Sequence, residues 1–221
     1  MARRIRRHAN PFHVRTELGH IDRMALFGRE APLEVDLGCG GASFLFERAR
    51  NHPECDFVGL EVRRPLVEVA AERRARDGIP NAIVLYASAS DNIRLAEPGI
   101  VRCFHIHFPD PCFKKRHWKR RIVQPTIVRA MCEALPIGGQ VYLQSDVEPL
   151  ALEMYAFLAS ESAFASRLDA HMIVARPFPE TTEWERQHER EGEPIYRMLF
   201  EKVREPVGEV APAVFHDTRP R

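Results

Sequence analysis

Long apolar runs are missing from this sequence. No run approaches the roughly 20 residues that a membrane helix needs, and no apolar signal-peptide core follows the basic residues 1–8. There is no C-x-x-C pair, and the number of cysteines is odd: Cys39, Cys55, Cys103, Cys112 and Cys132. We therefore expect free thiols in a reducing cytoplasm, and no membrane partner.

A large net charge is also missing. The formal net charge of +1 argues against a general polyanion binder, but the charges are unevenly distributed. Residues 1–29 and 114–121 are basic, whereas acidic residues are concentrated in the C-terminal third. The two basic regions are candidates for binding phosphates, although a charge run is often only a solvated face.

Apolar runs of strand length alternate with segments of helical period. We predict strands at 33–37, 56–61, 82–86, 101–108 and 140–144, and helices at 42–50, 65–77, 121–135 and 147–160. This alternation predicts a parallel sheet with helices on both faces. Alternating side chains in 194–203 predict a late strand that joins the sheet edge antiparallel. We expect a basic extension (1–31), one domain (32–203) and a loose, proline-rich tail (204–221).

The first predicted strand ends in a glycine-rich turn at residues 38–41. Such a turn lets the backbone approach a ligand at the carboxyl end of a strand. The dinucleotide-binding fingerprint needs a third glycine where this chain has Ser43, which argues against a dehydrogenase. Asp36 before the turn suits a cationic ligand, and Glu61 after the second strand suits two ribose hydroxyls. Together these two acids favour S-adenosylmethionine.

The segment 107–121 places one carboxylate between two prolines and in front of a cationic block. Pro109 and Pro111 restrict the backbone on both sides of Asp110, which predicts a stiff turn. Six positive charges follow within eight residues: Lys114, Lys115, Arg116, Lys119, Arg120 and Arg121. A carboxylate beside a phosphate-binding block indicates chemistry on a nucleic acid.

These motifs closely resemble those of the bacterial tRNA (guanine-N7)-methyltransferases over most of the chain. The most specific match is Phe108-Pro109-Asp110-Pro111 followed by Lys114-x-Arg116-His117-x-Lys119-Arg120-Arg121. Other matches are Ser145-Asp146-x-Glu148-Pro149, Thr182-Glu183-Trp184-Glu185 and Arg4-x-x-Arg7-His8-x-Asn10-Pro11. The resemblance implies an α/β, Rossmann-like class I methyltransferase fold, with a mostly parallel seven-stranded sheet, helices on both faces and an antiparallel edge strand.

The resemblance also implies methyl transfer from S-adenosylmethionine to N7 of a guanine in the variable loop of tRNA. By position, Asp110 is catalytic, and the cofactor-binding residues are Asp36, Gly38, Gly40, Glu61, Ser88 and Asp110. The substrate-binding residues are Lys114, Asp146, Thr182, Glu183, Trp184 and Glu185. The oligomeric state, monomer or homodimer, stays open.

Three positions depart from the family pattern. Cys112 replaces the usual tryptophan after the second proline, and Glu183 replaces a usually basic residue, so either could alter substrate binding. Ser88 stands where an acid that would hold the adenine end is expected, and Asp91 lies three residues further on. This third departure could weaken cofactor binding.

The chemistry of guanine N7 sets further expectations. The N7 atom has a lone pair and no proton, so the reaction needs no general base. In-line placement should supply much of the catalysis. Asp110 should stabilise the positive charge that develops on the base. An arginine at O6 and N7 would block the nucleophile. We therefore expect carboxylates to bind the Watson–Crick edge: Asp146, Glu183 and Glu185. We expect phosphate contacts from the N-terminal arginines and from Arg116, Lys119, Arg120 and Arg121.

Other interpretations stay open. Cys103, His105 and His107 share one face of a strand, and Cys112 follows nearby, but such residues without a metal are commoner, so we expect no metal site. A methyltransferase for another nucleic-acid base would share part of the pattern. A non-catalytic tRNA-binding protein would also share part of the pattern. This alternative stays open because Ser88 stands where an acid is expected. Trp118 suits an RNA-facing role and a core-filling role equally well.

Overall fold

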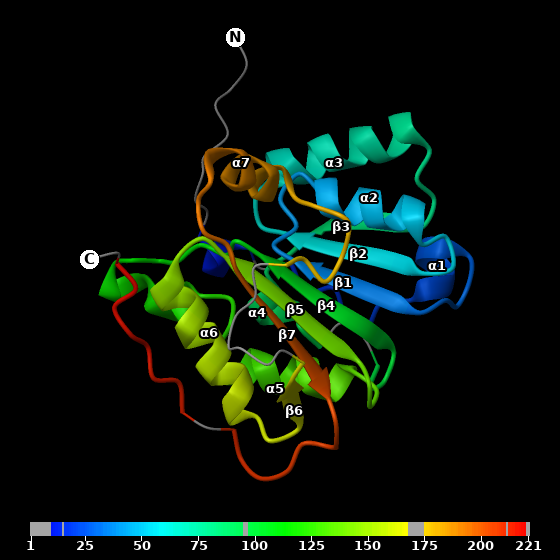
Figure 1. Cartoon of the computed structure of the whole chain (residues 1–221). Coiled ribbons are helices and arrows are strands. Elements are labelled where there is room, and N and C mark those ends of the chain that lie inside the picture. Colours follow the sequence, from blue (N-terminus) through cyan, green and yellow to red (C-terminus); the bar gives the residue numbers. More distant parts are fainter. Residues whose placement is uncertain (1–9, 15, 95–96, 168–174, 211, 220–221) are drawn as a thin grey trace.

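A single mixed sheet forms the centre of the molecule (Figure 1). The computed structural model describes residues 10–14, 16–94, 97–167, 175–210 and 212–219. Within them, the strands are β1 (Leu33–Leu37), β2 (Asp56–Glu61), β3 (Ala82–Tyr86), β4 (Val101–His107), β5 (Gln140–Ser145), β6 (Phe164–Ser166) and β7 (Tyr196–Lys202). The seven strands lie in the order β3-β2-β1-β4-β5-β7-β6.

The sheet is parallel from β3 to β5 and antiparallel beyond it. β7 pairs antiparallel with both β5 and β6, so the antiparallel edge consists of two strands and ends at the short β6. The predicted fold class is confirmed. The motif Arg4-x-x-Arg7-His8-x-Asn10-Pro11 lies largely outside the described residues.

Helices cover both faces of the sheet. They are α1 (Arg23–Phe27), α2 (Ser43–Asn51), α3 (Arg64–Asp77), α4 (Ala89–Asn92), α5 (Pro125–Ala134), α6 (Glu148–Ser160) and α7 (Glu183–Glu191), with 3-10 helices η1 (Pro11–His13) and η2 (Lys115–Arg120). The helix predicted at 121–135 begins only at Pro125, because a residue before proline avoids the helical conformation and Gln124 is extended. No helix of the described residues is both long and apolar enough to cross a membrane.

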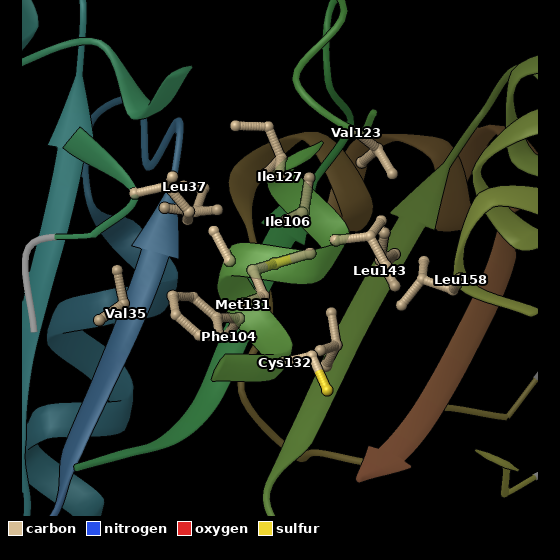
Figure 2. Packing of buried hydrophobic residues seen from close by; sticks show 14 of the residues in the cluster. Val35, Leu37, Phe104, Ile106, Val123, Ile127, Met131, Cys132, Leu143 and Leu158 are labelled. Atoms are coloured by element: carbon tan, nitrogen blue, oxygen red, sulfur yellow. The ribbon is translucent and has the colours of Figure 1, made fainter. Parts of the chain in front are cut away.

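The larger core lies between the sheet and the pair α5 and α6. Figure 2 shows Phe104 and Ile106 of β4 and Leu143 of β5 packing toward Met131 of α5. Side chains alternate along a strand, so the intervening residues of β1, Glu34 and Asp36, face the other side of the sheet. A smaller core fills that side under α2 and α3. Acidic side chains are therefore buried on the α2 face.

The described part of the C-terminal tail, for which the sequence predicts a loose conformation, makes several contacts with the domain. Arg129 of α5 donates hydrogen bonds to the carbonyls of Val207 and Gly208. Phe215 packs against the larger core, with its ring 6.1 Å from that of Phe157, and Thr218 is fully buried. The tail therefore follows α5 and α6 and forms part of the fold.

Candidate active site

The glycine-rich turn after β1 is held against the end of β2. The amides of Gly38 and Cys39 donate to the carbonyl of Leu60 at 2.8 and 3.1 Å. Gly38 and Gly40 have φ values of 84° and 58°, which suit glycine. A Cβ on Gly59 would lie 2.5 Å from the Cys39 sulfur, so only glycine lets β2 approach the turn this closely. The turn is therefore fixed by backbone contacts.

Asp36 and Ser88 carry polar atoms that are buried without partners. Oδ1 of Asp36, at the end of β1, and Oγ of Ser88, just after β3, have no hydrogen-bond partner. Burial, and secondarily the charge of Glu61, raise the pKa of Asp36 well above its usual range. An unpaired buried polar group costs free energy unless a ligand satisfies it. Asp36 thus suits a cationic ligand, and the Ser88 hydroxyl is available for a second polar contact.

Glu61 at the end of β2 links the glycine turn to Arg63. Its Oε2 accepts from the Gly40 amide at 2.9 Å and from Arg63 Nη2 at 3.0 Å, and its Oε1 accepts from the Arg63 amide and Nε. Glu61 is buried, whereas Arg63 is partly exposed. A ligand hydroxyl that binds Glu61 would therefore replace the Arg63 guanidinium, which can move to solvent.

Asp110 lies in a strained turn that follows β4. Phe108 and Cys112 adopt φ values of 47° and 46°, which cost free energy in non-glycine residues. The Cys112 amide donates to Asp110 Oδ1 at 2.9 Å, and the Phe108 amide donates to the carbonyl of Gln144 on β5. The Asp110 side chain itself is exposed. The turn thus presents a carboxylate to solvent at the carboxyl end of the sheet.

Cys112, which departs from the family pattern, lies buried behind this turn. Burial, and secondarily the nearby Asp110, raise the pKa of its thiol to about 12. The thiol is therefore protonated at neutral pH and is a poor nucleophile.

The basic segment of residues 114–121 divides into exposed and buried cations. Lys114, Lys115, Arg116 and Lys119 are exposed, and Arg120 is partly exposed. Arg121 is only 2% exposed and donates to both carboxylate oxygens of Glu153 at 2.7 Å. The guanidinium of Arg121 is buried and already paired, so the structure does not place it for the predicted phosphate contact.

Trp118 packs on Arg121. The Arg121 guanidinium lies 5.2 Å from the centre of the Trp118 ring, and the indole Nε1 is buried without a partner. The structure thus favours the packing role of Trp118 over a role facing RNA.

Helix α7 closes the site at the ends of β4 and β5. Asp146 follows β5, and its Oδ2 lies 3.4 Å from Trp184 Nε1 and 3.6 Å from His188 Nε2. The His188 ring stacks on Phe108 with centroids 5.8 Å apart. Asp146 and Trp184 are thereby brought next to the turn that carries Asp110, although about 35 to 75 residues separate them in the sequence.

Three predicted substrate-binding residues at the start of α7 differ in their surroundings. Thr182 caps the helix, since its hydroxyl accepts from the Glu185 amide at 2.9 Å, and Glu183 is exposed. Glu185 is 1% exposed and accepts hydrogen bonds from Arg197 at 2.8 Å and from Gln144 at 3.2 Å. Glu185 therefore holds α7 on the sheet, and its buried, paired carboxylate is not placed for the predicted contact with the base.

A buried ion network, which the sequence analysis missed, fixes the segment before α7. Arg48 of α2 donates to Glu34 of β1 and to Glu180, 132 residues away. His105 of β4 also contacts Glu34 at 2.8 Å. Burial alone would raise the pKa of Glu34, but the hydrogen bonds and charges of His105 and Arg48 outweigh it and lower this pKa to about 2. The sequence signal that could have indicated this network is Glu34, an acid at the second position of the apolar strand β1.

The histidines of β4 are engaged by protein groups. His105 contacts Glu34, and His107 Nδ1 lies 2.8 Å from Gln144 Nε2. Among the residues that the structure describes, no group of three or more His, Cys, Asp or Glu side chains could hold a metal ion.

Comparison with known proteins adds independent findings. A family model described as "Putative methyltransferase" matches residues 30–198. The tRNA (guanine-N(7)-)-methyltransferase of Trichormus variabilis is 36% identical over 90% of this chain and 96% of its own length. The enzyme of the same name from Synechocystis sp. is 37% identical over 92% of this chain and 100% of its own length.

Solved structures share the fold. The 16S rRNA methyltransferase KamB superposes with a TM-score of 0.59 at 15% identity, covering 84% of this chain and 95% of KamB. A variant of the 16S rRNA (adenine(1408)-N(1))-methyltransferase from Catenulisporales acidiphilia, with its cosubstrate S-adenosylmethionine, gives 0.54 at 16% identity, covering 84% and 93%. At these identities the likeness concerns the fold alone.

Proposed function

This chain belongs to the family of tRNA (guanine-N7)-methyltransferases, and from that premise we propose that it methylates N7 of a guanine in the variable loop of tRNA. The methyl donor is S-adenosylmethionine. The observation that carries the proposal is the position of Asp110, exposed on a constrained turn between a site that suits a cationic ligand and a row of exposed cations. A carboxylate there can serve a reaction that moves positive charge onto a base.

The methyl donor would bind across the ends of β1, β2 and β3. Its cationic end would pair with Asp36, whose buried oxygen has no other partner. Its ribose hydroxyls would take the place of the Arg63 guanidinium on Glu61, and Gly38 and Gly40 would let the backbone pass closely. Ser88 would make the polar contact at the adenine end. When bound, the donor supplies a methyl group that is already activated as a sulfonium.

The guanine would lie between Asp110 and α7. Asp146 and Glu183 are the accessible carboxylates for its N1–H and N2–H₂ donors, and the exposed Trp184 can stack on a base. The exposed Lys114, with Arg116, Lys119 and Arg120, would bind phosphates of the RNA. These contacts would leave O6 and N7 unobstructed for the reaction.

The protein contributes placement and charge stabilisation. Transfer of the methyl group to N7 would leave the donor neutral at sulfur and would move the positive charge to the base. Asp110 stabilises that charge, and no residue needs to accept a proton in this step. Fixed donors or carboxylates of this kind contribute about 10²- to 10³-fold in rate.

The substrate also indicates where the protein acts. We infer a cytoplasmic location, because the proposed substrate is tRNA.

The direct test incubates the protein with radiolabelled S-adenosylmethionine and unmodified tRNA, and maps the label after digestion. Label on guanine N7 in the variable loop supports the proposal. Label on another atom would retain methyl transfer and discard this substrate. Binding of both ligands without any label would favour a non-catalytic tRNA-binding protein.

A further inference from the structure

Arg121 differs from every other cation of the basic segment 114–121 because it lies inside the protein. Its neighbours Lys114, Lys115, Arg116 and Lys119 are exposed, whereas Arg121 ranks among the largest side chains that are almost fully buried. Its charge is matched by Glu153 of α6, which is 3% exposed. A residue placed this way cannot reach a phosphate without unfolding its surroundings.

The guanidinium of Arg121 joins three parts of the chain. Nη1 donates to both oxygens of Glu153 and to the carbonyl of His216, and Nη2 donates to Thr218 Oγ1 at 2.9 Å. Glu153 in turn accepts from the His216 amide at 2.6 Å. The tail is thereby fixed to α6 through Arg121. Thr218, which lies 97 residues after Arg121 in the chain, is fully buried at this contact.

The remaining donor of the same guanidinium reaches the turn that carries Asp110. Nε of Arg121 donates to the carbonyl of Pro111 at 2.9 Å. That carbonyl lies between Asp110 and Cys112, whose φ of 46° is unfavourable for a side-chain-bearing residue. A strained conformation persists only where its surroundings hold it. Arg121 supplies such a contact from a side chain that is itself held by five further hydrogen bonds or packing contacts.

We propose that Arg121 is a positioning residue for Asp110, and that the tail residues His216 and Thr218 hold the Arg121 guanidinium in place. The inference rests on the proposed function, because it concerns the turn that carries the reacting carboxylate. It differs from a phosphate-binding role in a measurable way. A positioning residue changes the rate of methyl transfer in the assembled complex, whereas a phosphate contact changes the affinity for tRNA and its salt dependence.

The test compares Arg121→Gln with Arg116→Gln, a matched change at an exposed arginine of the same segment. We expect Arg121→Gln to lower the single-turnover rate at saturating tRNA and S-adenosylmethionine by about 10- to 100-fold, with the Kd for tRNA and its salt slope unchanged. Arg116→Gln should show the pattern of a lost phosphate contact, with weaker tRNA binding and a salt slope whose magnitude is reduced by about 0.9. The reverse pattern for Arg121 would overturn the proposal.

A second variant separates positioning from folding. Arg121→Gln leaves the buried Glu153 unpaired, and this can unfold the protein, but replacing a buried ion pair by apolar residues often preserves stability. The double variant Arg121→Met with Glu153→Leu should therefore restore the melting temperature toward that of the wild type without restoring the rate. Recovery of the rate along with stability would show that Arg121 has only a structural role, and would overturn the proposal.

The tail is tested by Thr218→Val, which removes the hydroxyl that accepts from Arg121. We expect the single-turnover rate to fall by roughly 5-fold, with tRNA affinity retained. An unchanged rate would remove the tail from the proposal.

A readout without catalysis keeps this test separate from the proposed function. Cys112 follows Pro111 and is buried, so its alkylation, followed by mass spectrometry of its peptide, reports opening of the turn. Both Arg121 variants and Thr218→Val should alkylate faster at Cys112 than the wild type and Arg116→Gln. Absence of methyl transfer in the wild type would reject the function, whereas unchanged alkylation in the Arg121 variants would reject the positioning role.

Discussion

The two halves of the candidate site are held together by different means. On the side of the glycine turn, residues 36–41 and 59–61 lie at the ends of two neighbouring strands and are joined mainly by backbone hydrogen bonds. On the side of Asp110 and α7, the contacts are buried side-chain pairs between distant residues. Arg121 and Glu153 are 32 positions apart, Gln144 and Glu185 are 41, and Arg48 and Glu180 are 132.

The two kinds of contact differ in how well they tolerate amino-acid substitutions. Backbone contacts survive most substitutions, so the first half depends on a few glycines and two acids. A buried charge that loses its partner is strongly destabilising, so the second half is sensitive to single changes in its ion pairs. The half that would bind the methyl donor is thus locally determined, whereas the half that would bind tRNA depends on the whole fold.

The largest expected effect comes from Asp110, which lies between the two halves. Asp110→Asn should lower the single-turnover rate by about 10²- to 10³-fold, because an amide does not stabilise a developing positive charge as a carboxylate does. Binding of S-adenosylmethionine, by calorimetry, and of tRNA, by filter retention, should persist. Full turnover with both ligands bound would refute the assigned role.

The next largest effect is expected at Glu34, whose substitution tests how far the second half depends on buried charge. Glu34→Gln should lower the free energy of unfolding by about 3 kcal/mol at pH 7, because Arg48 loses its main counter-charge. It should weaken tRNA binding through the segment before α7 and leave binding of S-adenosylmethionine unchanged. An equal loss of both affinities would contradict the independence of the halves.

The pKa of Glu34 also fixes the direction of a pH effect. A lowered carboxyl pKa contributes stability that is present above the unfolded value of 4.5 and is lost as the pH falls toward about 2. Urea unfolding between pH 7 and pH 3 should therefore show a smaller loss in Glu34→Gln than in the wild type. The exposed Glu97→Gln is the control and should retain the wild-type profile.

A smaller effect is expected in the first half, where a substitution of Asp36 should raise stability but lower the affinity for the methyl donor. The raised pKa of Asp36 reflects the cost of its buried charge, and this cost to stability is relieved as the pH falls from the folded-state pKa toward the unfolded value of 3.8. Asp36→Asn should raise the stability of the ligand-free protein by about 1–2 kcal/mol and lower the affinity for S-adenosylmethionine by about 10-fold, or 1.4 kcal/mol.

Thermal unfolding and calorimetry over a pH series check both effects of Asp36→Asn. In the wild type, affinity for the cationic ligand should increase with pH as Asp36 ionises, and the variant should lose this dependence. The affinity for tRNA should stay constant. A destabilised Asp36→Asn protein would mean that the carboxylate is satisfied within the protein.

The smallest expected effect is at the surface of the second half. Lys119→Gln should reduce the magnitude of the salt slope of tRNA binding by about 0.9 and change the free energy of unfolding by less than about 0.5 kcal/mol. Titrations of tRNA at several salt concentrations measure the slope. An unchanged slope would place the RNA away from η2.

Residue patterns alone predict the strand–helix alternation, the glycine turn, the paired acids Asp36 and Glu61 and the constrained turn at Asp110. These features are local: periodicity, glycine and proline restrict the backbone within a few residues, whatever surrounds them. Short elements without such signals, including β6 and the helix α7, were not predicted.

Which charged residues are exposed and which are buried depends on the packing of elements that are distant in the sequence. Arg121 and Glu185 belong to motifs whose neighbours are exposed, yet both are buried in ion pairs with residues on other elements. The C-terminal tail is polar and proline-rich, yet Thr218 is buried against Arg121. The physical reason is that the burial of a charge depends on its partner, and these partners lie 12 to 97 positions away, where no local pattern indicates them.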